Sequence, residues 1–298
     1  MVRLGIVGIP TDWEQKFLPV LESLAPRVEV VAVFDHVRFR AARLAQALSA
    51  SATGGVLALA RRSDVDGILL LDNGWYGSAI WSHLSDVAKP VFLADDSEFD
   101  DELVKQIHTA NGRSGALWMP ELTLRYFPAT YRLMELQATH CGTIRSLAMH
   151  WPVGEATAEI HHLVDWCRYV TGAAQVSIAE PVQVDGHSTE FRIEARAGHT
   201  IRVAVEFGQP FRAVAGCAQG RIAIHGPHDL EWTQHSDGRT DNDARREDLT
   251  DDRPGRQVML DHFCRRVAGG LIPVPTLAEL QIARQLARQI ASPADTPH

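Results

Sequence analysis

The chain has 298 residues, enough for two domains of ordinary size with substantial cores. Its 45% hydrophobic and 22% charged residues are typical of a soluble globular protein, and a net charge of −8 argues against nucleic-acid binding, which requires a basic surface. No apolar run approaches the roughly 18–20 residues that span a bilayer. Because the N-terminus runs directly into a strand pattern and lacks the order of a signal peptide, we expect a cytoplasmic protein without a membrane partner.

Residues 1–118 alternate short apolar runs with amphipathic segments. Near-continuous apolar strands separated by helices indicate a parallel sheet covered on both faces, and right-handed crossovers make it doubly wound, as in a Rossmann-type domain. Strands are predicted at 3–8, 28–34, 65–71 and 90–93, and helices at 12–24, 38–48, 56–62, 77–87 and 100–110.

The pattern changes after residue 118, and residues 119–298 are predicted to form a second α/β domain. Alternation of apolar and polar residues over 173–233 predicts a largely antiparallel sheet with one open face. A further strand is expected at 144–151, and helices at 127–138, 157–171, 257–268 and 276–291.

The two faces of the antiparallel strands differ in chemistry. The inward set is Phe191, Ile193, Ala195, Ile201, Val203, Val205 and Phe207, and the outward set is Arg192, Glu194, Arg196, Arg202, Ala204 and Glu206. Because the outward set balances positive and negative charge, two copies related by a two-fold axis can pair those charges, which predicts a homodimer through this sheet. A solvated face suits the same charges.

A long polar segment and four separate cysteines are further features of the chain. Residues 234–256 are almost purely polar and predict a long mobile loop, cut first by proteases at Arg239, Arg245 or Arg246. The cysteines, which form no C-x-x-C pair, are expected to be reduced and mostly buried; they are Cys141, Cys167, Cys217 and Cys264.

The turn after the first predicted strand departs from the dinucleotide-binding pattern G-x-G-x-x-G. It reads Gly8-Ile9-Pro10-Thr11-Asp12-Trp13, so only the first glycine is present. Pro10 lacks an N–H for a phosphate, and Asp12 places a negative charge at the start of the following helix. Asp35 follows the second strand, where either a ribose-binding acid or an ordinary helix-starting acid is expected. The sequence predicts a Rossmann shape with weak or absent NAD(P)H binding.

The order of segments resembles the glucose–fructose oxidoreductase and inositol dehydrogenase family, Gfo/Idh/MocA. The similar segments are VRLGIVG, VEVVAVFDHVRFRAARLA, SDVDGILLLDNGWYGSAIWSHLSDVAKPVFLADD, LRYFPATYRLMELQATHCGTIRSL, EIHHLVDWCRYVTG and VMLDHFCRRVAGGLIPVPTLAELQIARQLARQIA. The resemblance implies a two-domain fold and NAD- or NADP-dependent oxidation or reduction of a sugar, inositol or related polyol.

Transfer of the family's motifs to this sequence is incomplete. The lysine of the E-K-P motif is replaced by Asp95, and the aspartate of the D-x-x-x-H motif by Ala158. His162 and Asp165 keep the register of the H-x-x-D helix, so His162 is a candidate general acid or base. The absence of its lysine and aspartate partners favours the simpler interpretation, a helix residue without chemistry. The candidate catalytic residues are His162, Asp165 and Asp95, and the candidate cofactor-binding residues are Gly8, Ile9, Pro10, Asp35, Asp72 and Asn73.

Other constellations offer weaker signals. His161 and His162 are adjacent on a predicted helix and point about 100° apart, so no metal site is predicted there. Trp75 and Tyr76 follow the 65–71 strand and suit either stacking on a sugar or base or burial under the second domain, whereas Trp81 is expected in the core.

Three functional hypotheses remain open at this stage. The first is an oxidoreductase that uses NAD or NADP on a small polyhydroxylated substrate. The second is a non-catalytic binding or assembly protein that keeps the fold without nicotinamide chemistry. The third is a lyase or hydrolase that uses Asp95, Asp96 and His162.

Overall fold

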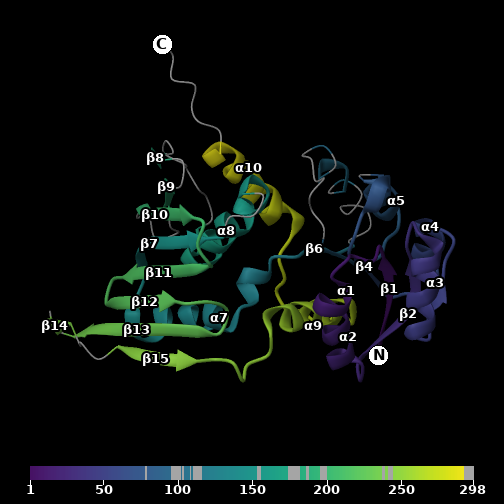
Figure 1. Ribbon diagram of the computed structural model, residues 1–298, viewed down its shortest axis with the longest axis horizontal. Coiled ribbons are helices and arrows are strands. Elements are labelled where there is room, and N and C mark those ends of the chain that lie inside the picture. Colours follow the sequence, from purple (N-terminus) through teal and green to yellow (C-terminus); the bar gives the residue numbers. More distant parts are fainter. Residues whose placement is uncertain are drawn as a thin grey trace, which may run out of the picture. The chain divides into compact units, whose positions relative to one another are not determined.

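The structure is a computed structural model that describes residues 1–77, 79–94, 102, 104–107, 109, 116–152, 156–173, 182–185, 188–194, 200–236, 239–240 and 244–291. The chain divides into two compact units (Figure 1). The first unit contains Met1–Glu121 and Arg256–Gln281, and the second contains Leu122–Gly255 and Ile282–His298. The chain therefore returns to the first unit near its end, which a single boundary at residue 118 does not describe.

The first unit contains a six-stranded parallel sheet with the order β3-β2-β1-β4-β5-β6, which confirms the Rossmann-type prediction. β4 and β5 are buried at every position because helices cover both faces of a parallel sheet. The strands are β1 Val2–Val7, β2 Val28–Phe34, β3 Ser51–Ala52, β4 Gly67–Leu70, β5 Val91–Leu93 and β6 Trp118–Pro120.

The helix predicted over 12–24 is two short helices, α1 Trp13–Lys16 and α2 Leu18–Leu24. Pro19 lies in the first turn of α2, where a proline is tolerated because its missing N–H has no intrahelical acceptor. The other helical elements given for this unit are α3 Arg38–Ala47, α4 Val56–Ala60, η1 Gly74–Tyr76, α5 Ala79–Ser85 and α9 Gly255–Val267. Helix α10, Leu277–Ala291, begins in this unit and ends in the second one.

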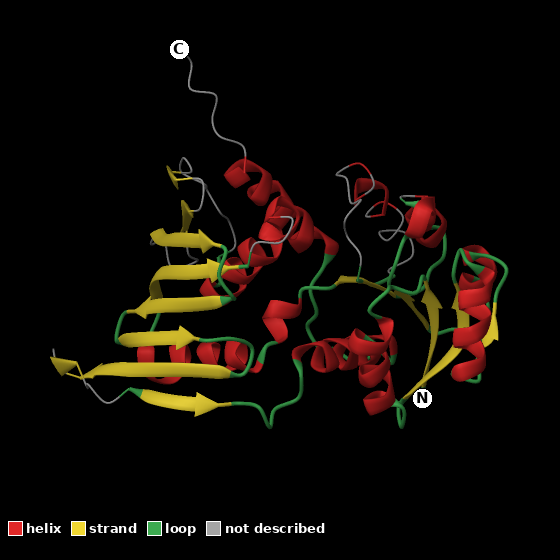
Figure 2. Cartoon of the chain, in the orientation of Figure 1, coloured by secondary structure: helices red, strands yellow, loops and turns green. Residues whose placement is uncertain are grey.

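The second unit contains a nine-stranded sheet with the order β14-β13-β12-β11-β7-β10-β9-β8, to which β15 adds by pairing with β13 (Figure 2). Only the β10–β7 pair is parallel among these described strands, so the prediction of a largely antiparallel sheet is confirmed. The strands are β7 Ile144–Trp151, β8 Val182–Asp185, β9 Ser188–Glu194, β10 Thr200–Phe207, β11 Arg212–Cys217, β12 Gly220–Ile224, β13 Asp229–Ser236, β14 Arg239–Thr240 and β15 Arg245–Asp248.

One face of this sheet packs on helices, and the second unit has its core there. The helical elements are η2 Thr123–Tyr126, α7 Pro128–Leu136, η3 Gln137–Cys141 and α8 Ala156–Thr171. Leu133 of α7 and Trp166 of α8 are fully buried in the same cluster as the strand residues. Phe191, Ile193, Ile201, Val203 and Val205 are buried as predicted and Phe207 is partly buried, whereas Ala195 and Arg196 lie outside the described residues.

The prediction of a mobile loop over 234–256 is wrong where the structure describes that segment. β15 pairs with β13 from Trp232–Arg245 to Asp229–Asp248, and α9 begins at Gly255. The charged side chains of β15 have fixed partners, which offset the entropy of ordering a polar strand. Arg246 donates to Asp229, and Arg132 of α7 donates to Glu247.

The four cysteines carry free thiols, and three of them are buried, as predicted. No helix within the described part of the chain is long and apolar enough to cross a membrane.

Candidate functional site

The strand order of the first unit reverses between β1 and β4, which lie side by side at its centre. Open α/β sheets bind ligands at such a switch point, outside the carboxyl ends of the strands. Gly8 follows β1 with φ +77°, and a Cβ there would lie 2.0 Å from the carbonyl oxygen of Asp72. Glycine is required because no side chain fits, and this approach brings two predicted site residues together at the switch point.

Asp35 is buried, and its carboxylate accepts hydrogen bonds from the protein's own backbone. The Ile9 N–H donates to Oδ2 at 2.9 Å, and the Val37 N–H donates to Oδ1 at 2.8 Å. Arg40 donates from Nη2 to the carbonyl oxygen of Ile9, and its Nη1 lies 3.9 Å from Asp35 Oδ2. Both backbone polar groups of Ile9 are therefore occupied by side chains that follow β2.

Pro10, Asp12 and Trp13 of the same turn also make internal contacts. Pro10 has no N–H, and its carbonyl accepts from the Trp13 N–H at 3.2 Å. Asp12 forms an ion pair with Lys16, so a carboxylate lies at the start of α1, which has only four residues. Trp13 is buried against Phe17, with ring centroids 6.3 Å apart. A dinucleotide diphosphate needs free N–H groups at this turn, and these residues do not fit it.

Asp72 and Asn73 lie at the carboxyl end of β4. Asp72 Oδ1 accepts a hydrogen bond of 2.7 Å from the Gly74 N–H. Asn73 is 3% exposed, and within the described structure neither its Oδ1 nor its Nδ2 has a hydrogen-bond partner. Gly74 has φ +54°, and a Cβ there would lie 2.7 Å from His36 Nδ1. The segment 72–74 is therefore in contact with Gly8 and with the loop after β2.

Trp75 and Tyr76 are the last two residues of η1, which begins at Gly74. Their ring centroids are 4.0 Å apart at an interplanar angle of 23°, and Tyr76 lies 6.2 Å from Phe34. Trp75 is 73% exposed, so its ring is available for stacking. Trp81 is fully buried in α5, as predicted.

The candidate catalytic residues of the second unit lie on α8. Asp165 is buried and accepts two hydrogen bonds from Arg125 of η2, from Nε at 2.7 Å and from Nη2 at 2.5 Å. The Arg125 guanidinium also lies 4.9 Å from the ring centroid of Tyr169. Two parallel charge-assisted bonds fix the Asp165 carboxylate and make it a partner of Arg125. No sequence motif indicated a role for Arg125, although it stands in the LRYFP segment.

His162 is half-buried, and its ring centroid lies 4.2 Å from that of His161, which is buried. Among the residues that the structure describes, no three His, Cys, Asp or Glu side chains are grouped to hold a metal ion. Asp95 and Asp96 lie outside the described residues, so the E-K-P position stays a prediction.

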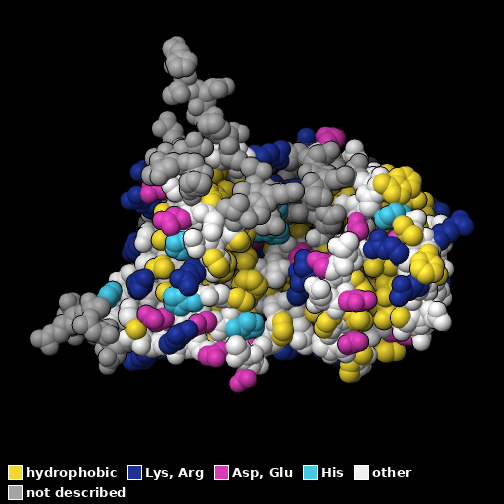
Figure 3. Space-filling model, in the orientation of Figure 1, with side chains coloured by type: hydrophobic (Ala, Val, Ile, Leu, Met, Phe, Trp, Pro, Cys, Tyr) yellow, Lys and Arg dark blue, Asp and Glu magenta, His cyan; other side chains and the backbone are white. Residues whose placement is uncertain are grey.

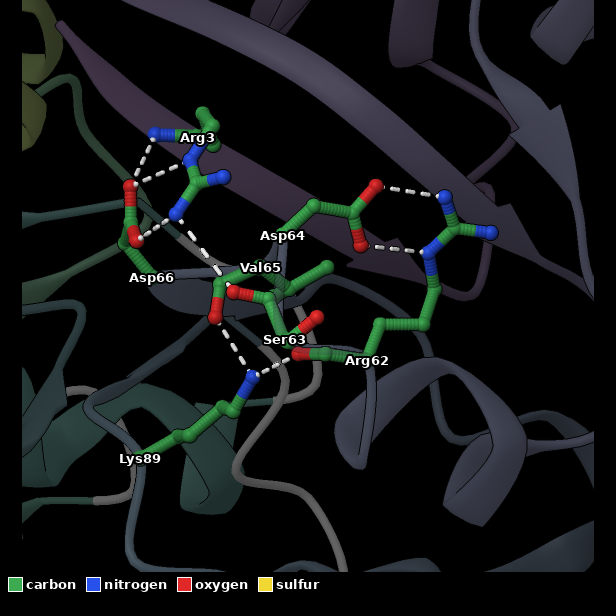
Figure 4. Close-up of polar contacts among 7 residues, drawn as sticks. All are labelled: Arg3, Arg62, Ser63, Asp64, Val65, Asp66 and Lys89. Atoms are coloured by element: carbon green, nitrogen blue, oxygen red, sulfur yellow. Dashed lines mark hydrogen bonds and ion pairs between the residues drawn. The ribbon is translucent and has the colours of Figure 1, made fainter.

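The opposite, amino-terminal edge of the first sheet carries a separate network of ion pairs (Figure 4). Arg3 donates from Nε and Nη2 to Asp66 at 3.1 and 2.7 Å, which lowers the pKa of that carboxyl group. Arg62 forms two bonds with Asp64, and Lys89 donates to two backbone carbonyls, while burial lowers the pKa of its amine. These contacts join the start of β1 to the segment before β4 and hold their register.

Charged side chains of both signs are interspersed on the face drawn in Figure 3, and no broad basic patch gathers there. The exposed pair Arg202–Glu190 on the outward face of β10 and β9 has an Nη2–Oε1 distance of 2.5 Å.

No protein-family model and no curated protein matches the chain. Solved structures match it over nearly its whole length. They include the dehydrogenase MviM from Clostridium difficile, with a TM-score of 0.77, 13% identity and coverage of 97% of this chain and 98% of that chain. A super-repressor mutant of Gal80p from Saccharomyces cerevisiae matches with a TM-score of 0.79 and 13% identity, covering 97% and 95%.

The 3-ketoreductase KijD10 from Actinomadura kijaniata, solved with NADP and TDP-benzene, matches with a TM-score of 0.76 and 15% identity over 97% of both chains. These similarities show that the chain has the two-domain fold of Gfo/Idh/MocA-type oxidoreductases. Identities of this size show the fold alone, because one fold hosts many functions.

Proposed function

We propose that this chain is a divergent member of the Gfo/Idh/MocA family that binds a small molecule and has lost nicotinamide chemistry. The observation that carries the proposal is the closed turn after β1. Asp35 and Arg40 occupy both backbone groups of Ile9, and Pro10 offers no donor. The switch point remains the place where this fold presents a ligand site. The match to a repressor is consistent with a member of this fold that acts by binding.

Titration with NADH and NADPH tests the proposal directly. We expect no saturable binding by isothermal titration calorimetry at micromolar protein concentration. Micromolar, stoichiometric binding of either nucleotide would show that the turn opens and would reject the proposal.

A second candidate is an NAD- or NADP-dependent oxidoreductase that acts on a sugar, inositol or related polyol. The comparisons favour it, because the matched chains include a dehydrogenase and a ketoreductase, and the latter was solved with NADP. In this interpretation Gly8, Asp35 and Asp72 would lie beside the dinucleotide. The closed turn does not fit that group.

Under the second candidate, mutation of His162 tests its role as the general acid or base. If a polyol-dependent reduction of NAD or NADP is found, His162→Ala should abolish the turnover, because a neutral-range imidazole suits proton transfer. His161→Ala provides the matched control on the neighbouring position. Equal rates for the wild type and His162→Ala would remove this residue from the mechanism.

We also infer that the protein forms a homodimer through the open face of the nine-stranded sheet. Small side chains cross the centre of this face in register, with Ala148 opposite both Ala204 and Val214, and Val214 opposite Ala223. Charged pairs such as Arg202–Glu190 flank them. Small apolar side chains flanked by charges of both signs suit an isologous interface, in which the same patch of each copy meets across a two-fold axis.

A further inference from the structure

The chain passes between its two units at three places. It leaves the first unit after Glu121, returns to it after Gly255 and leaves it again after Gln281. The first passage follows β6, the second lies at the start of α9, and the third lies inside α10, which is continuous from Leu277 to Ala291. Segments that join two domains determine which motions the domains can make relative to one another.

Glu121 and Arg256, the first-unit residues at the first two passages, form an ion pair. The Arg256 guanidinium donates to Oε1 of Glu121 from Nε at 3.0 Å and from Nη2 at 2.6 Å. The side chain of Glu121 is 12% exposed and that of Arg256 is 25% exposed, so solvent ions screen this pair less than a surface pair. The two residues are 135 positions apart in the sequence, and their bonds join two segments that the chain itself leaves separate.

Both partners of this ion pair are also fixed to the rest of the first unit. The Glu121 N–H donates to the Leu93 carbonyl oxygen at 2.8 Å, which continues the pairing of β6 with β5. The Arg256 guanidinium lies 5.4 Å from the ring centroid of Phe17, which is 3% exposed, and a cation over an aromatic face is attracted to it. The ion pair therefore holds the start of α9 beside the end of β6.

The same two segments also lie close together on their second-unit side. Gly255 is buried, and a Cβ there would lie 2.9 Å from the carbonyl oxygen of Tyr126 and 3.2 Å from Cδ1 of Phe127. Tyr126 is the last residue of η2, which begins two residues after Glu121. Because a glycine has no Cβ, it allows this close approach of one backbone to another. The first two passages therefore run together on both sides of the point where the chain changes units.

We propose that Glu121 and Arg256 clamp the first two passages into one pivot of a hinge between the units. Two rigid bodies that are held at two points can rotate only about the line through those points. The clamp supplies one point and the continuous helix α10 supplies the other, so the remaining motion is rotation about a single axis. Loss of the clamp replaces a fixed pivot with two independent connections. This assignment does not depend on any ligand of the first unit.

Double electron–electron resonance between two spin labels tests the proposal on the full chain. Ala42→Cys on α3 and Ala138→Cys on η3 place one label at an exposed position in each unit. Dilution with unlabelled protein restricts the measurement to distances within one molecule. Glu121→Gln and Arg256→Gln should each broaden the distance distribution. The double variant should broaden it no further, because both changes remove the same contact.

Arg62→Gln is the matched control. It breaks two bonds to Asp64 at the opposite edge of the first sheet, where the Arg62 side chain is 30% exposed, and should leave the distribution unchanged. A distribution as narrow in both clamp variants as in the wild type would overturn the proposal. Equal broadening in Arg62→Gln would also overturn it, because the first unit would then be loosened as a whole. Failure of Glu121→Gln to fold, measured by circular dichroism, would show a requirement for folding in place of a hinge clamp and would reject the proposal.

Discussion

Arg132 and Glu247 join helix α7 to strand β15 through two parallel hydrogen bonds, Nε to Oε2 at 2.6 Å and Nη2 to Oε1 at 2.8 Å. Trp232 of β13 donates from Nε1 to the same Oε1 at 2.8 Å. The side chains of Arg132 and Glu247 are 24% and 25% exposed. Three donors on one mostly buried carboxylate explain why a polar segment forms an ordered strand.

Glu247→Gln should lower the free energy of unfolding by about 1–2 kcal/mol, because the charge-assisted bonds to Arg132 are weakened. Urea denaturation followed by circular dichroism measures the change. Glu190→Gln is the control, since Glu190 pairs with an Arg202 side chain that is 69% exposed and solvent screens that pair. Equal midpoints for the two variants would contradict the prediction.

Acid should destabilise the protein through its paired carboxylates. The Arg132 bonds lower the pKa of Glu247, and the Arg3 bonds lower the pKa of Asp66. Such groups stabilise the fold fully above their unfolded pKa values, about 4.3 for Glu and 3.9 for Asp, and lose that contribution as pH falls through the folded values. The thermal unfolding temperature should therefore decrease when the pH is lowered below about 4. This decrease should be smaller in Glu247→Gln than in the wild type. A midpoint that is constant from pH 6 to pH 3 would refute this account.

Asp35→Ala should destabilise the first unit by about 2–4 kcal/mol, because the N–H groups of Ile9 and Val37 and the guanidinium of Arg40 lose a buried acceptor. Asp12→Ala, which removes a more exposed ion pair with Lys16, is the control and should have a smaller effect. Unchanged stability in Asp35→Ala would mean that the carboxylate is held for a ligand instead.

The thiols should resist alkylation in the native protein. Burial raises the pKa of Cys217 and of Cys264 to about 12, and that of Cys167 higher still, so little thiolate is present at pH 8. Iodoacetamide at pH 8 should label all four cysteines in urea and few in buffer, as counted by mass spectrometry. Rapid labelling of Cys167 in buffer would show that the second unit opens readily.

Arg202→Glu should weaken the inferred dimer, because the reversed charge lies beside Glu190 and is repeated by the two-fold axis. Size-exclusion chromatography with light scattering measures the mass. Arg61→Glu, an exposed position at the end of α4, is the control and should not change it. A wild-type mass near 32.9 kDa at micromolar concentration would reject the dimer.

The sequence by itself determined the type of each sheet and four of the six strands of the first one. The near-continuous apolar runs 28–34 and 65–71 favour burial on both faces, which indicates a parallel sheet between helix layers. Strict alternation through 191–194 and 201–207 assigns one face to the core, since successive side chains of a strand point in opposite directions. The position of Asp35 after β2 and the missing N–H of Pro10 could also be predicted from the sequence, because each depends only on the local order of residues.

Only the tertiary structure decided which buried polar side chains have hydrogen-bond partners within the chain and which do not. Asp165 is held by Arg125, 40 positions away, and Glu247 by Arg132, 115 positions away, so no local pattern contains either pair. The segment at 245–248 is polar in sequence. It forms a strand because Arg132, which is distant in the sequence, pairs with the charge of Glu247. Whether Asp35 faces a ribose or Ile9, and whether Asn73 has a partner, depends on how separate loops meet at the end of the sheet, and only the folded chain brings those loops together.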